Sequence, residues 1–588
     1  MLIDVAVPEV VINSLSYESV NALEEGTRVI VEVGRTLRTG FVLGRAVKPL
    51  PKGVKAKHIE GVIDERRIID ADIWDLAVWC GKTGMCGTAA ALKAALPMRF
   101  YTGEKIDAPA ETEPSAENFR ERNFYDPFDS ERADFFLSEL TELKCNERTL
   151  IIFPKREQAK TFFKNLPDDI KSESLLWPSD SSPKLWEAWK MIRSRKIRIV
   201  VAPPGGVFAP LMPHKIIVEN EADPAYVIPY TLNLSARSLA GHRAFFLKAE
   251  FITAGRIPSL KTYRRTKPVE SVTPERKNII LADIHRSKKE SVNGIEGDIP
   301  LTFSLIKHTY RALLNHRNVI WILNRTGESS EVFCGNCGEV IRCCKCGGIM
   351  RSVNNGELLK CRTCGTLREL PGKCEKCGYY LFTGRRPGIE ALAKIAAKYY
   401  SDVHVFADGA LISDMHGLIL ATKGGLSLCG KINPSLVAWL DLDAELRGQE
   451  HTTRFNVFSM LWESYWSGRT RDSERKVLIQ SRRSGMKVAE FLAKGWGKFI
   501  PDELKLRKEF LLPPYGYIIE IECSSITKRE EITDNLTDAG IFVMDPGDEG
   551  QPLYVSSESL EAVRKIIEPE ILLRNTKKNF IKITVRGE

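Results

Sequence analysis

The sequence has no run of about 18 apolar residues, the length that a helix needs to cross a bilayer, and its N-terminus lacks the layout of a signal peptide. We therefore expect no membrane partner and a cytoplasmic location. A strong excess of one charge is also missing, because the formal net charge of +9 permits contact with nucleic acid but does not establish it. At 588 residues the chain exceeds what one hydrophobic core supports, so we expect several domains.

A complete phosphate-binding loop is missing too. In the pattern G-x-x-x-x-G-K-[ST], backbone N–H groups and a lysine hold a triphosphate, and the sequence contains no such stretch. Gly81-Lys82-Thr83 matches the end of this pattern, but residue 76 is Leu and the preceding residues favour helix rather than strand. We expect no nucleotide there.

Cysteine is concentrated in one place, since nine of the fourteen cysteines lie between Cys334 and Cys377. Eight of them form C-x-x-C pairs, a spacing at which one tight turn directs two thiolates at one tetrahedral ion. The pairs are Cys334/Cys337, Cys343/Cys346, Cys361/Cys364 and Cys374/Cys377. Disulfides are the alternative, but clustered cysteines in a reducing compartment hold metal more often than they cross-link. Eight ligands predict two structural zinc ions, and Cys344 is left as a spare thiol.

The gaps between the eight cysteines run two, five, two, fourteen, two, nine and two residues, and Leu323-Asn324-Arg325-Thr326-Gly327 precedes them. An L-N-R-x-G stretch followed by cysteines at these gaps resembles the primosomal replication-restart helicases, the PriA family. The resemblance implies that the cysteine segment is inserted into the second RecA-like lobe of a motor. It also implies nested sites, with Cys334, Cys337, Cys374 and Cys377 on one zinc and Cys343, Cys346, Cys361 and Cys364 on the other. Spacing alone leaves the pairing open.

The N-terminal region is predicted to contain short strands followed by helix. Val5–Ile12, Thr27–Val33 and Gly40–Val47 are β-rich, as in a small barrel, and Ile69–Leu96 has a helical apolar stripe. The stretch from Gly26 to Val42 is similar to the family's N-terminal domain, which binds the 3′ end of a nascent DNA strand.

The family's F-D-Y motif in this domain corresponds to Leu15-Ser16-Tyr17, where the acid is gone. The tyrosine of the motif is kept, so Tyr17 is a candidate DNA contact. The alternative is a barrel without specificity for the 3′-hydroxyl end.

The predicted fold class is multidomain α/β, with two RecA-like parallel-sheet lobes. We predict an N-terminal DNA-binding domain at 1–101 and a linker at 102–122, where the family has a winged helix. The first lobe is expected at 123–268, and the second at 269–330 and 381–519 around a two-zinc insert at 331–380. A small C-terminal α+β domain is expected at 520–588. The strands expected in the first lobe are Thr149–Pro154, Ile197–Pro203 and Lys215–Glu219.

The motor motifs are degenerate. Placed on the family's pattern, Asp129-Ser130-Glu131-Arg132-Ala133 stands where the motor has G-S-G-K-T. Carboxylates repel a triphosphate, and Cβ atoms obstruct the close approach of its phosphates to the backbone. The magnesium-binding D-E-E-H motif corresponds to Glu219-Asn220-Glu221-Ala222, which keeps two carboxylates but forms a weak metal site without a phosphate loop. We predict a degenerate nucleotide site at Asp129, Ser130, Glu131, Arg132, Ala133, Glu219 and Glu221, with no catalytic residue and neither ATP nor magnesium as cofactor.

Two further motor motifs have changed. The G-S-A-T-P motif is Ala254-Gly255-Arg256-Ile257-Pro258, and the R-x-x-R arginines fall at Ser467 and Thr470, with Arg469 and Arg471 in another register. Motifs that concern folding are kept. They are Asp223 with Tyr226, Ala236-Arg237 with Leu239-Ala240, the D-x-D-x-x-L-R stretch Asp441–Arg447, and Leu512-Pro513-Pro514-Tyr515.

Aromatic and basic residues alternate at Tyr263–Arg265, Trp462–Arg475 and Lys494–Phe499, a composition that suits stacking on bases and contact with phosphates. The alternative is that these aromatics are core residues and the charges a solvated face. The cysteine segment adds a basic surface, and in the family this region contacts the fork and partner proteins. The candidate DNA contacts are Tyr17, Arg237, Arg342, Arg362, Arg469 and Arg471.

The resemblance, together with the degenerate motor, predicts a replication-restart protein that binds forked or single-stranded DNA without ATP hydrolysis. Its expected partners are primosome and replisome proteins such as a helicase loader and the single-strand-binding protein, and its location the nucleoid of a bacterial cytoplasm. One alternative is an active ATP-dependent 3′-to-5′ DNA helicase. Another is a zinc-containing interaction scaffold without DNA binding.

Overall fold

The computed structural model describes residues 1–8, 14–46, 49–50, 55–107, 118–178, 182–227, 232, 234–284, 289–292, 295–298, 301–325, 329–353, 358–380, 382–406, 416–448, 450–482, 484–547, 551–573 and 581–587. These residues form two compact units. The first contains Met1–Tyr125, Glu131–Pro268 and Asp502–Glu588, and the second contains Asp126–Ser130 and Val269–Pro501.

The N-terminal region is a closed five-stranded barrel with strand order β1-β2-β5-β3-β4. Its strands are β1 (Leu2–Ala6), β2 (Leu15–Glu18), β3 (Arg28–Val33), β4 (Thr36–Arg45) and β5 (Lys57–Val62). Ile3, Val5, Val29 and Val31 are buried at alternate positions, as the pleat of a strand requires. The predicted barrel is therefore present, and residues 9–12 of the expected first strand lie outside the described residues.

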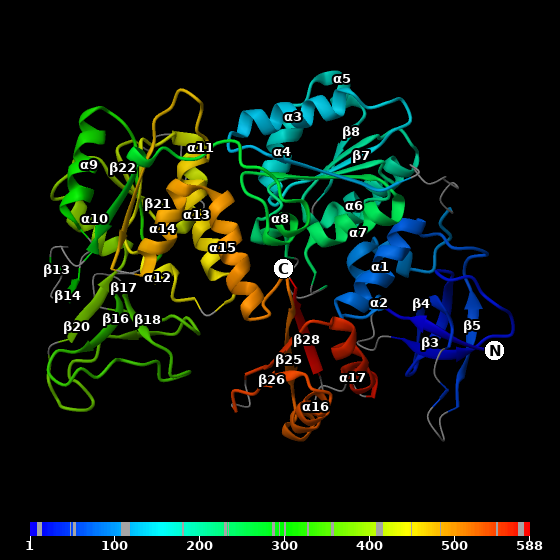
Figure 1. Ribbon diagram of the computed structural model, residues 1–588. Coiled ribbons are helices and arrows are strands. Elements are labelled where there is room, and N and C mark those ends of the chain that lie inside the picture. The colour runs from blue at the N-terminus through cyan, green and yellow to red at the C-terminus, as the bar shows by residue number, and fades with distance from the viewer. Residues whose placement is uncertain are drawn as a thin grey trace. The chain divides into compact units, whose positions relative to one another are not determined.

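Two helices follow the barrel and join it to the first lobe. They are α1 (Ala71–Thr83) and α2 (Thr88–Ala95), and α1 lies against α7 (Ala236–Leu247) of the lobe (Figure 1). Arg243 of α7 pairs with Asp72 of α1 at 2.6 Å, and both side chains are fully buried. Side chains from the barrel, from α1 and α2 and from the lobe belong to one continuous hydrophobic core, so this part of the first unit packs as one body.

The first lobe is a six-stranded parallel sheet with order β6-β11-β10-β7-β9-β8. Its strands are β6 (Arg120–Tyr125), β7 (Thr149–Ile152), β8 (Ser174–Leu176), β9 (Ile199–Ala202), β10 (Lys215–Val218) and β11 (Glu250–Gly255). One face packs on α3 (Asp129–Thr141) and α4 (Arg156–Lys164), the other on α6 (Ser182–Arg193) and α7. Strand β6 begins inside the range predicted as linker.

The second lobe is also a six-stranded parallel sheet, with order β12-β24-β23-β15-β22-β21. Its strands are β12 (Ile279–Asp283), β15 (Val319–Ile322), β21 (Val403–Phe406), β22 (Leu418–Ala421), β23 (Leu436–Trp439) and β24 (Lys476–Ser481). Helices α9 (Phe303–Leu314) and α10 (Ile389–Ala396) share one core with the sheet. The lobe also contains α13 (Thr453–Trp466) and α14 (Ser484–Lys494), and α15 (Trp496–Glu509) follows them.

The cysteine-rich insert leaves this lobe after β15 and returns before α10. It is a five-stranded sheet with order β19-β18-β17-β16-β20. The strands are β16 (Ser329–Cys334), β17 (Met350–Val353), β18 (Leu358–Cys361), β19 (Leu367–Glu369) and β20 (Phe382–Pro387). Four of the eight buried residues of its hydrophobic core are cysteines, so the insert has little other hydrophobic support.

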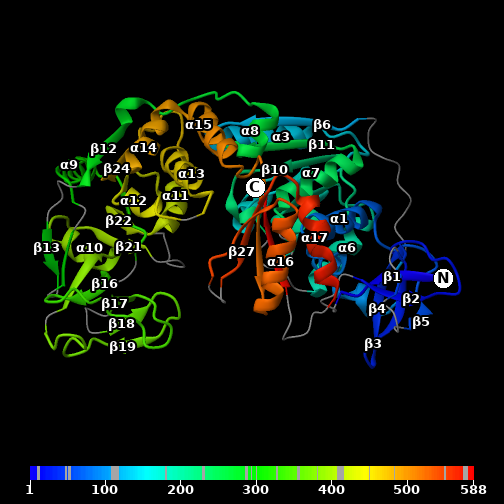
Figure 2. The ribbon, with the colours of Figure 1, turned by 60° about the horizontal axis from the view of Figure 1, so that its bottom comes forward.

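The C-terminal domain has the order β-α-β-β-α-β. Its elements are β25 (Tyr517–Cys523), α16 (Ile526–Asp538), β26 (Phe542–Met544), β27 (Leu553–Ser557), α17 (Leu560–Leu573) and β28 (Ile581–Arg586). The antiparallel sheet has order β26-β27-β25-β28, the arrangement of a split β-α-β fold. Both helices pack on the same face of the sheet (Figure 2).

The predicted fold class is confirmed: two parallel-sheet lobes, an N-terminal barrel, a cysteine insert in the second lobe and a small α+β domain are all present. Within the described residues, no helix is both long enough and apolar enough to cross a membrane.

Candidate functional site

The eight paired cysteines of the insert converge in two groups of four. One group is Cys334, Cys337, Cys374 and Cys377, and the other is Cys343, Cys346, Cys361 and Cys364. This is the nested membership that the family resemblance implied. Within each group the Sγ atoms all lie within 4.8 Å of one another.

The sulfur geometry fits a tetrahedral ion. Neighbouring Sγ atoms are 3.5 Å apart for Cys334 and Cys377 and 3.6 Å apart for Cys343 and Cys364. A tetrahedral zinc ion with Zn–S bonds of about 2.3 Å places its ligands roughly 3.8 Å apart. Each group can therefore hold one metal ion with every position filled by sulfur, which is the arrangement of a structural site rather than a catalytic one.

In each group, hydrogen bonds favour the thiolate form of at least one cysteine, whereas desolvation and the neighbouring sulfurs raise the pKa of Cys337 and Cys346 to about 12. The hydroxyl of Thr366 lies 3.1 Å from Cys364 Sγ, and this contact lowers the pKa of the Cys364 thiol to about 6. In the other group, the backbone N–H of Tyr379 lowers the pKa of Cys377 to about 6. Such outer contacts hold ligands in orientation and were not visible in the spacing of the cysteines.

The region that corresponds to the phosphate loop has a different structure. Strand β6 is followed directly by α3, whose first turn contains Asp129, Ser130, Glu131 and Arg132. Acidic side chains in the first turn interact favourably with the positive end of the helix dipole. In a nucleotide-binding loop, a phosphate occupies this place at the start of the helix. Ser130 and Ala133 are exposed and make no cradle.

Arg132 turns into the lobe and pairs with Glu219 at the end of β10, at 2.9 Å. Only 3% of Arg132 and 8% of Glu219 are exposed. The cation predicted at the phosphate-loop position is thus held by a carboxylate predicted to belong to the magnesium motif. The two buried charges neutralise each other.

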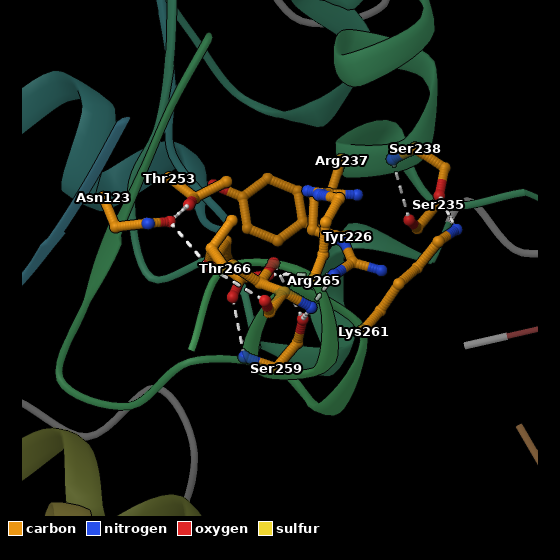
Figure 3. Close-up of polar contacts among 12 residues, drawn as sticks. Asn123, Tyr226, Ser235, Arg237, Ser238, Thr253, Ser259, Lys261, Arg265 and Thr266 are labelled. Carbon is orange, nitrogen blue, oxygen red and sulfur yellow. Dashed lines mark hydrogen bonds and ion pairs between the residues drawn. The ribbon is translucent and has the colours of Figure 1, made fainter. Parts of the chain in front are cut away.

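Glu221, the other surviving carboxylate, is the centre of a second buried network. It accepts hydrogen bonds from the Tyr125 hydroxyl at 2.9 Å, from Arg237 at 2.9 Å and from the backbone N–H of Ser259 at 2.6 Å. Burial and the neighbouring Glu221 raise the pKa of Tyr125 well above its usual range. Figure 3 shows polar contacts in this part of the lobe, among them the hydrogen bond that the Thr253 hydroxyl donates to Asn123.

The kept folding motifs have visible structural roles. The Asp223 carboxylate accepts from the backbone N–H of Ala225, and the Tyr226 hydroxyl lies 2.8 Å from the carbonyl oxygen of Ile152. In the second lobe, Asp441 of the D-x-D motif pairs with Arg325 of the L-N-R-x-G stretch at 2.5 Å. These contacts are internal to each lobe.

The structure corrects the expectation for two candidate DNA contacts. Tyr17 is 3% exposed inside the barrel and donates from its hydroxyl to the carbonyl of Glu32, while Arg237 is buried against Glu221. Neither side chain reaches a surface, because each completes a core contact of its own domain.

The other candidates differ in exposure. Arg469 stacks over Tyr465 with its guanidinium 4.5 Å from the ring centroid, and Arg471 lies 5.0 Å from the ring centroid of Phe128. Arg342 and Arg362 are exposed on the insert.

Aromatic and basic residues alternate at Tyr263–Arg265, Trp462–Arg475 and Lys494–Phe499. In these stretches most aromatic residues are core residues, as the alternative interpretation held. Trp462, Tyr465, Trp466, Trp496 and Phe499 are all buried.

Comparisons with known proteins agree with the N-terminal architecture. Residues 4–97 match the family described as the 3′DNA-binding domain (3′BD) of PriA. These residues cover the barrel together with α1 and α2.

Curated relatives match over much more of the chain. A protein named "Replication restart protein PriA" from Rickettsia typhi is 25% identical over 426 residues, which is 66% of this chain and 63% of that protein. The protein of the same name from Bacillus subtilis is 23% identical and covers 58% of this chain and 45% of its own length. That from Borreliella burgdorferi is 21% identical over 81% of this chain and 78% of its own length. The alignment thus spans less than two thirds of the Rickettsia typhi and Bacillus subtilis relatives.

Among solved structures, Mss116p bound to single-stranded RNA and AMP-PNP has 11% sequence identity and a TM-score of 0.32, covering 65% of this chain and 70% of that chain.

Proposed function

We propose that the chain is a divergent member of the PriA family and that it is a replication-restart protein that binds forked or single-stranded DNA without hydrolysing ATP. In this role it helps to assemble the primosome or replisome by recruiting partners such as a helicase loader and the single-strand-binding protein. The proposal places it at the nucleoid of the cytoplasm.

The observation that carries the loss of ATP hydrolysis is the buried pair of Arg132 and Glu219. A motor needs a cation that is available to phosphate and a carboxylate that is available to magnesium. Here each group neutralises the other at 2.9 Å, and separating them to admit a nucleotide would leave two buried charges without partners. Ala133 also lacks the hydroxyl that would bind the metal.

The insert supports the proposed contact with DNA. We propose that its two groups of cysteines hold zinc ions, which make a small polar domain rigid. The cations on this domain are Arg342, Lys345, Arg351, Lys360, Arg362, Arg368, Lys373 and Lys376, and Arg368 is matched by Glu375 at 3.2 Å. Lys376 is matched by Glu339 at 2.8 Å, and Arg342 and Arg362 are exposed. A rigid surface of this charge suits a phosphate backbone.

The test follows ATP turnover and fork binding in the same samples of zinc-loaded protein. We expect fork binding whose affinity falls as salt rises, with no turnover above the background of a Glu219→Ala variant. The charge reversals Arg342→Glu and Arg362→Glu should together weaken fork binding roughly tenfold. They should also reduce the slope of log K against log salt by about one for each cation removed. Lys190→Glu, an equal reversal on α6, serves as the matched control.

An active helicase remains the second candidate, because Arg132, Glu219 and Glu221 retain a cation and two carboxylates. DNA-stimulated turnover that Glu219→Ala abolishes would establish it. Binding that is absent at every salt concentration would leave the interaction scaffold.

A further inference from the structure

Helix α9 has one face that is fixed to the second lobe. Leu305 and Thr309 are buried, and the Thr309 hydroxyl accepts a hydrogen bond from the indole of Trp321 at 2.9 Å. At the start of the helix, Thr302 caps the N–H of Leu305 and donates to Gln480 at 2.6 Å. These contacts prevent rotation of the helix, so its opposite face is defined.

The opposite face carries three large apolar side chains that face solvent. Phe303 is 78% exposed, Tyr310 is 55% exposed and Leu314 is 61% exposed. Their spacing of seven and then four residues places them along one line of the helix, over about 16 Å. Scattered apolar residues on a surface are ordinary, but a line of three at helical spacing is typical of a helix that pairs with another.

The charges along this line are all positive. Lys307 lies between Phe303 and Tyr310, and Arg311 follows Tyr310. Burial lowers the pKa of His308 on this helix. The positive charges of Lys476, Arg311 and Lys307 lower it further. The face therefore combines an apolar line with cations beside it.

We propose that the exposed face of α9 is a docking surface for an acidic amphipathic helix of a partner protein. The partner's apolar residues pack on Phe303, Tyr310 and Leu314, and its carboxylates lie opposite Lys307 and Arg311. The identity of the partner as a replication protein rests on the proposed function, whereas the docking chemistry does not.

The geometry favours a helix over single-stranded nucleic acid as the occupant. Phe303 and Tyr310 are seven residues apart, so their rings attach to the helix about 10 Å from each other with a lysine between them. Stacked bases lie much closer together than this, whereas a heptad separation is the repeat of a partner helix. A convex helix also offers no groove for a phosphate backbone.

The experiment measures fluorescence anisotropy of a labelled designed peptide on full-length, zinc-loaded protein. The peptide has about 18 residues, with leucine at every a and d position of its heptads and glutamate at the flanking positions. Its counterpart has lysine in place of every glutamate. A labelled oligo-dT is titrated in parallel, so that a failure of docking and a failure of DNA binding are separate results.

We expect the glutamate peptide to bind at least tenfold more tightly than the lysine peptide, with a loss of about tenfold in the double variant Phe303→Ser, Tyr310→Ser. The charge reversal Lys307→Glu, Arg311→Glu should invert the preference between the peptides. Leu367→Ser, an exposed apolar residue on the insert, is the matched control and should bind as the wild type does. The urea midpoint of each variant shows that it is folded.

Equal binding of the two peptides, or binding that the α9 variants leave unchanged, would overturn the proposal. Loss of oligo-dT binding in these variants without loss of the peptide would make the face a nucleic-acid surface. Light scattering that shows a dimer abolished by Phe303→Ser would make the occupant a second copy of this chain.

Discussion

At the scale of single residues, position 132 holds a cation that is part of a core. Its guanidinium points inward and pairs with Glu219. A buried ion pair adds little net stability compared with an apolar pair of the same shape, whereas removing one partner leaves a buried charge unpaired. Substitutions at the two positions should therefore be strongly non-additive.

We predict that Arg132→Met lowers the stability of the first lobe by about 3–5 kcal/mol, because Glu219 is left charged and buried. The double variant Arg132→Met, Glu219→Gln should recover most of this loss. The measurement is the urea midpoint, followed by tryptophan fluorescence. The exposed pair Lys190 and Glu187 is the control, since Lys190→Ala should cost less than about 1 kcal/mol. Equal and additive losses for the two single variants would contradict the interpretation.

Glu270 is a second residue whose role the sequence did not reveal. Its carboxylate accepts the backbone N–H groups of Trp496 at 2.8 Å and Gly497 at 3.0 Å, and so caps the start of α15 from 226 residues away in the chain. Burial outweighs these two hydrogen bonds and raises the pKa of Glu270 to about 7. The group therefore holds its proton more tightly in the folded state than in the unfolded state.

This pKa predicts a loss of stability with rising pH. The contribution of Glu270 is fully present below about pH 4.5, its unfolded value, and disappears as the pH rises through 7. Urea midpoints of the wild type and of Glu270→Gln at pH 5, 6 and 7.5 provide the test. The urea midpoint of the wild type, relative to that of the variant, should fall steadily from pH 5 to pH 7.5. A difference in midpoint that does not change with pH would contradict the raised pKa of Glu270.

At the scale of elements, the start of α15 also depends on a glycine. Gly495 has φ of +83°, and a Cβ at this position would lie 2.2 Å from a carboxylate oxygen of Glu270. In Gly495→Ala, the alanine would have to adopt a left-handed backbone conformation and would also clash with Glu270. We therefore expect this substitution to lower the free energy of unfolding by roughly 1–3 kcal/mol. Gly430→Ala is the control, because open space surrounds that position. The measurement is again the urea midpoint, and equal effects at the two glycines would count against the clash.

The insert should depend on metal for its fold. Because half of the buried residues of its hydrophobic core are cysteines, few other side chains can replace the ligands. We expect two equivalents of zinc in the purified protein by mass spectrometry, and about one after Cys361→Ser, since each group of four binds independently. Chelation should make β16–β20 accessible to protease. Cys344→Ser is the control and should retain both ions, and a loss of zinc from it would assign Cys344 as a ligand.

The elements that the sequence predicts best are those with strong periodicity or spacing. Lys215–Val218 and Thr149–Ile152 are continuous apolar runs, and both are central strands. The strands β2 and β5 were missed because they are short and largely polar, as in Lys57–Val62. Strand β6 was assigned in part to a linker, since Arg120–Tyr125 has charged residues on an edge strand. Contacts between distant residues, such as Glu221 with Tyr125, have no signature in a single sequence.

At the scale of the whole chain, the first unit joins the barrel, α1 and α2 to the first lobe through buried contacts. Besides the pair of Arg243 and Asp72, Trp79 of α1 stacks on His242 of α7 at 4.1 Å. His242 in turn lies 2.8 Å from Asp75. Phe100 meets Trp189 of α6 edge to face at 5.2 Å. The barrel and the lobe should therefore lose structure together.

We predict that Asp72→Ala destabilises both parts at once by about 3–5 kcal/mol, because Arg243 is left charged in a dry core. Hydrogen exchange measured by mass spectrometry should show faster exchange in β3 and in β10 to a similar extent. Strand β15 in the second unit is the internal reference and should keep its protection. Faster exchange in the barrel alone would show that the shared core does not couple the two parts.

This shared core has an evolutionary consequence. The first lobe forms one wall of the domain that matches the 3′DNA-binding family, so a deletion of the lobe would expose the apolar surface of α1 and α2. A substitution in α6 or α7 that opens this core is therefore expected to weaken the barrel as well, whatever chemistry the lobe performs. The constraint on the lobe's sequence is therefore expected to follow its contribution to this core and to buried pairs such as Arg132 and Glu219, rather than nucleotide chemistry alone.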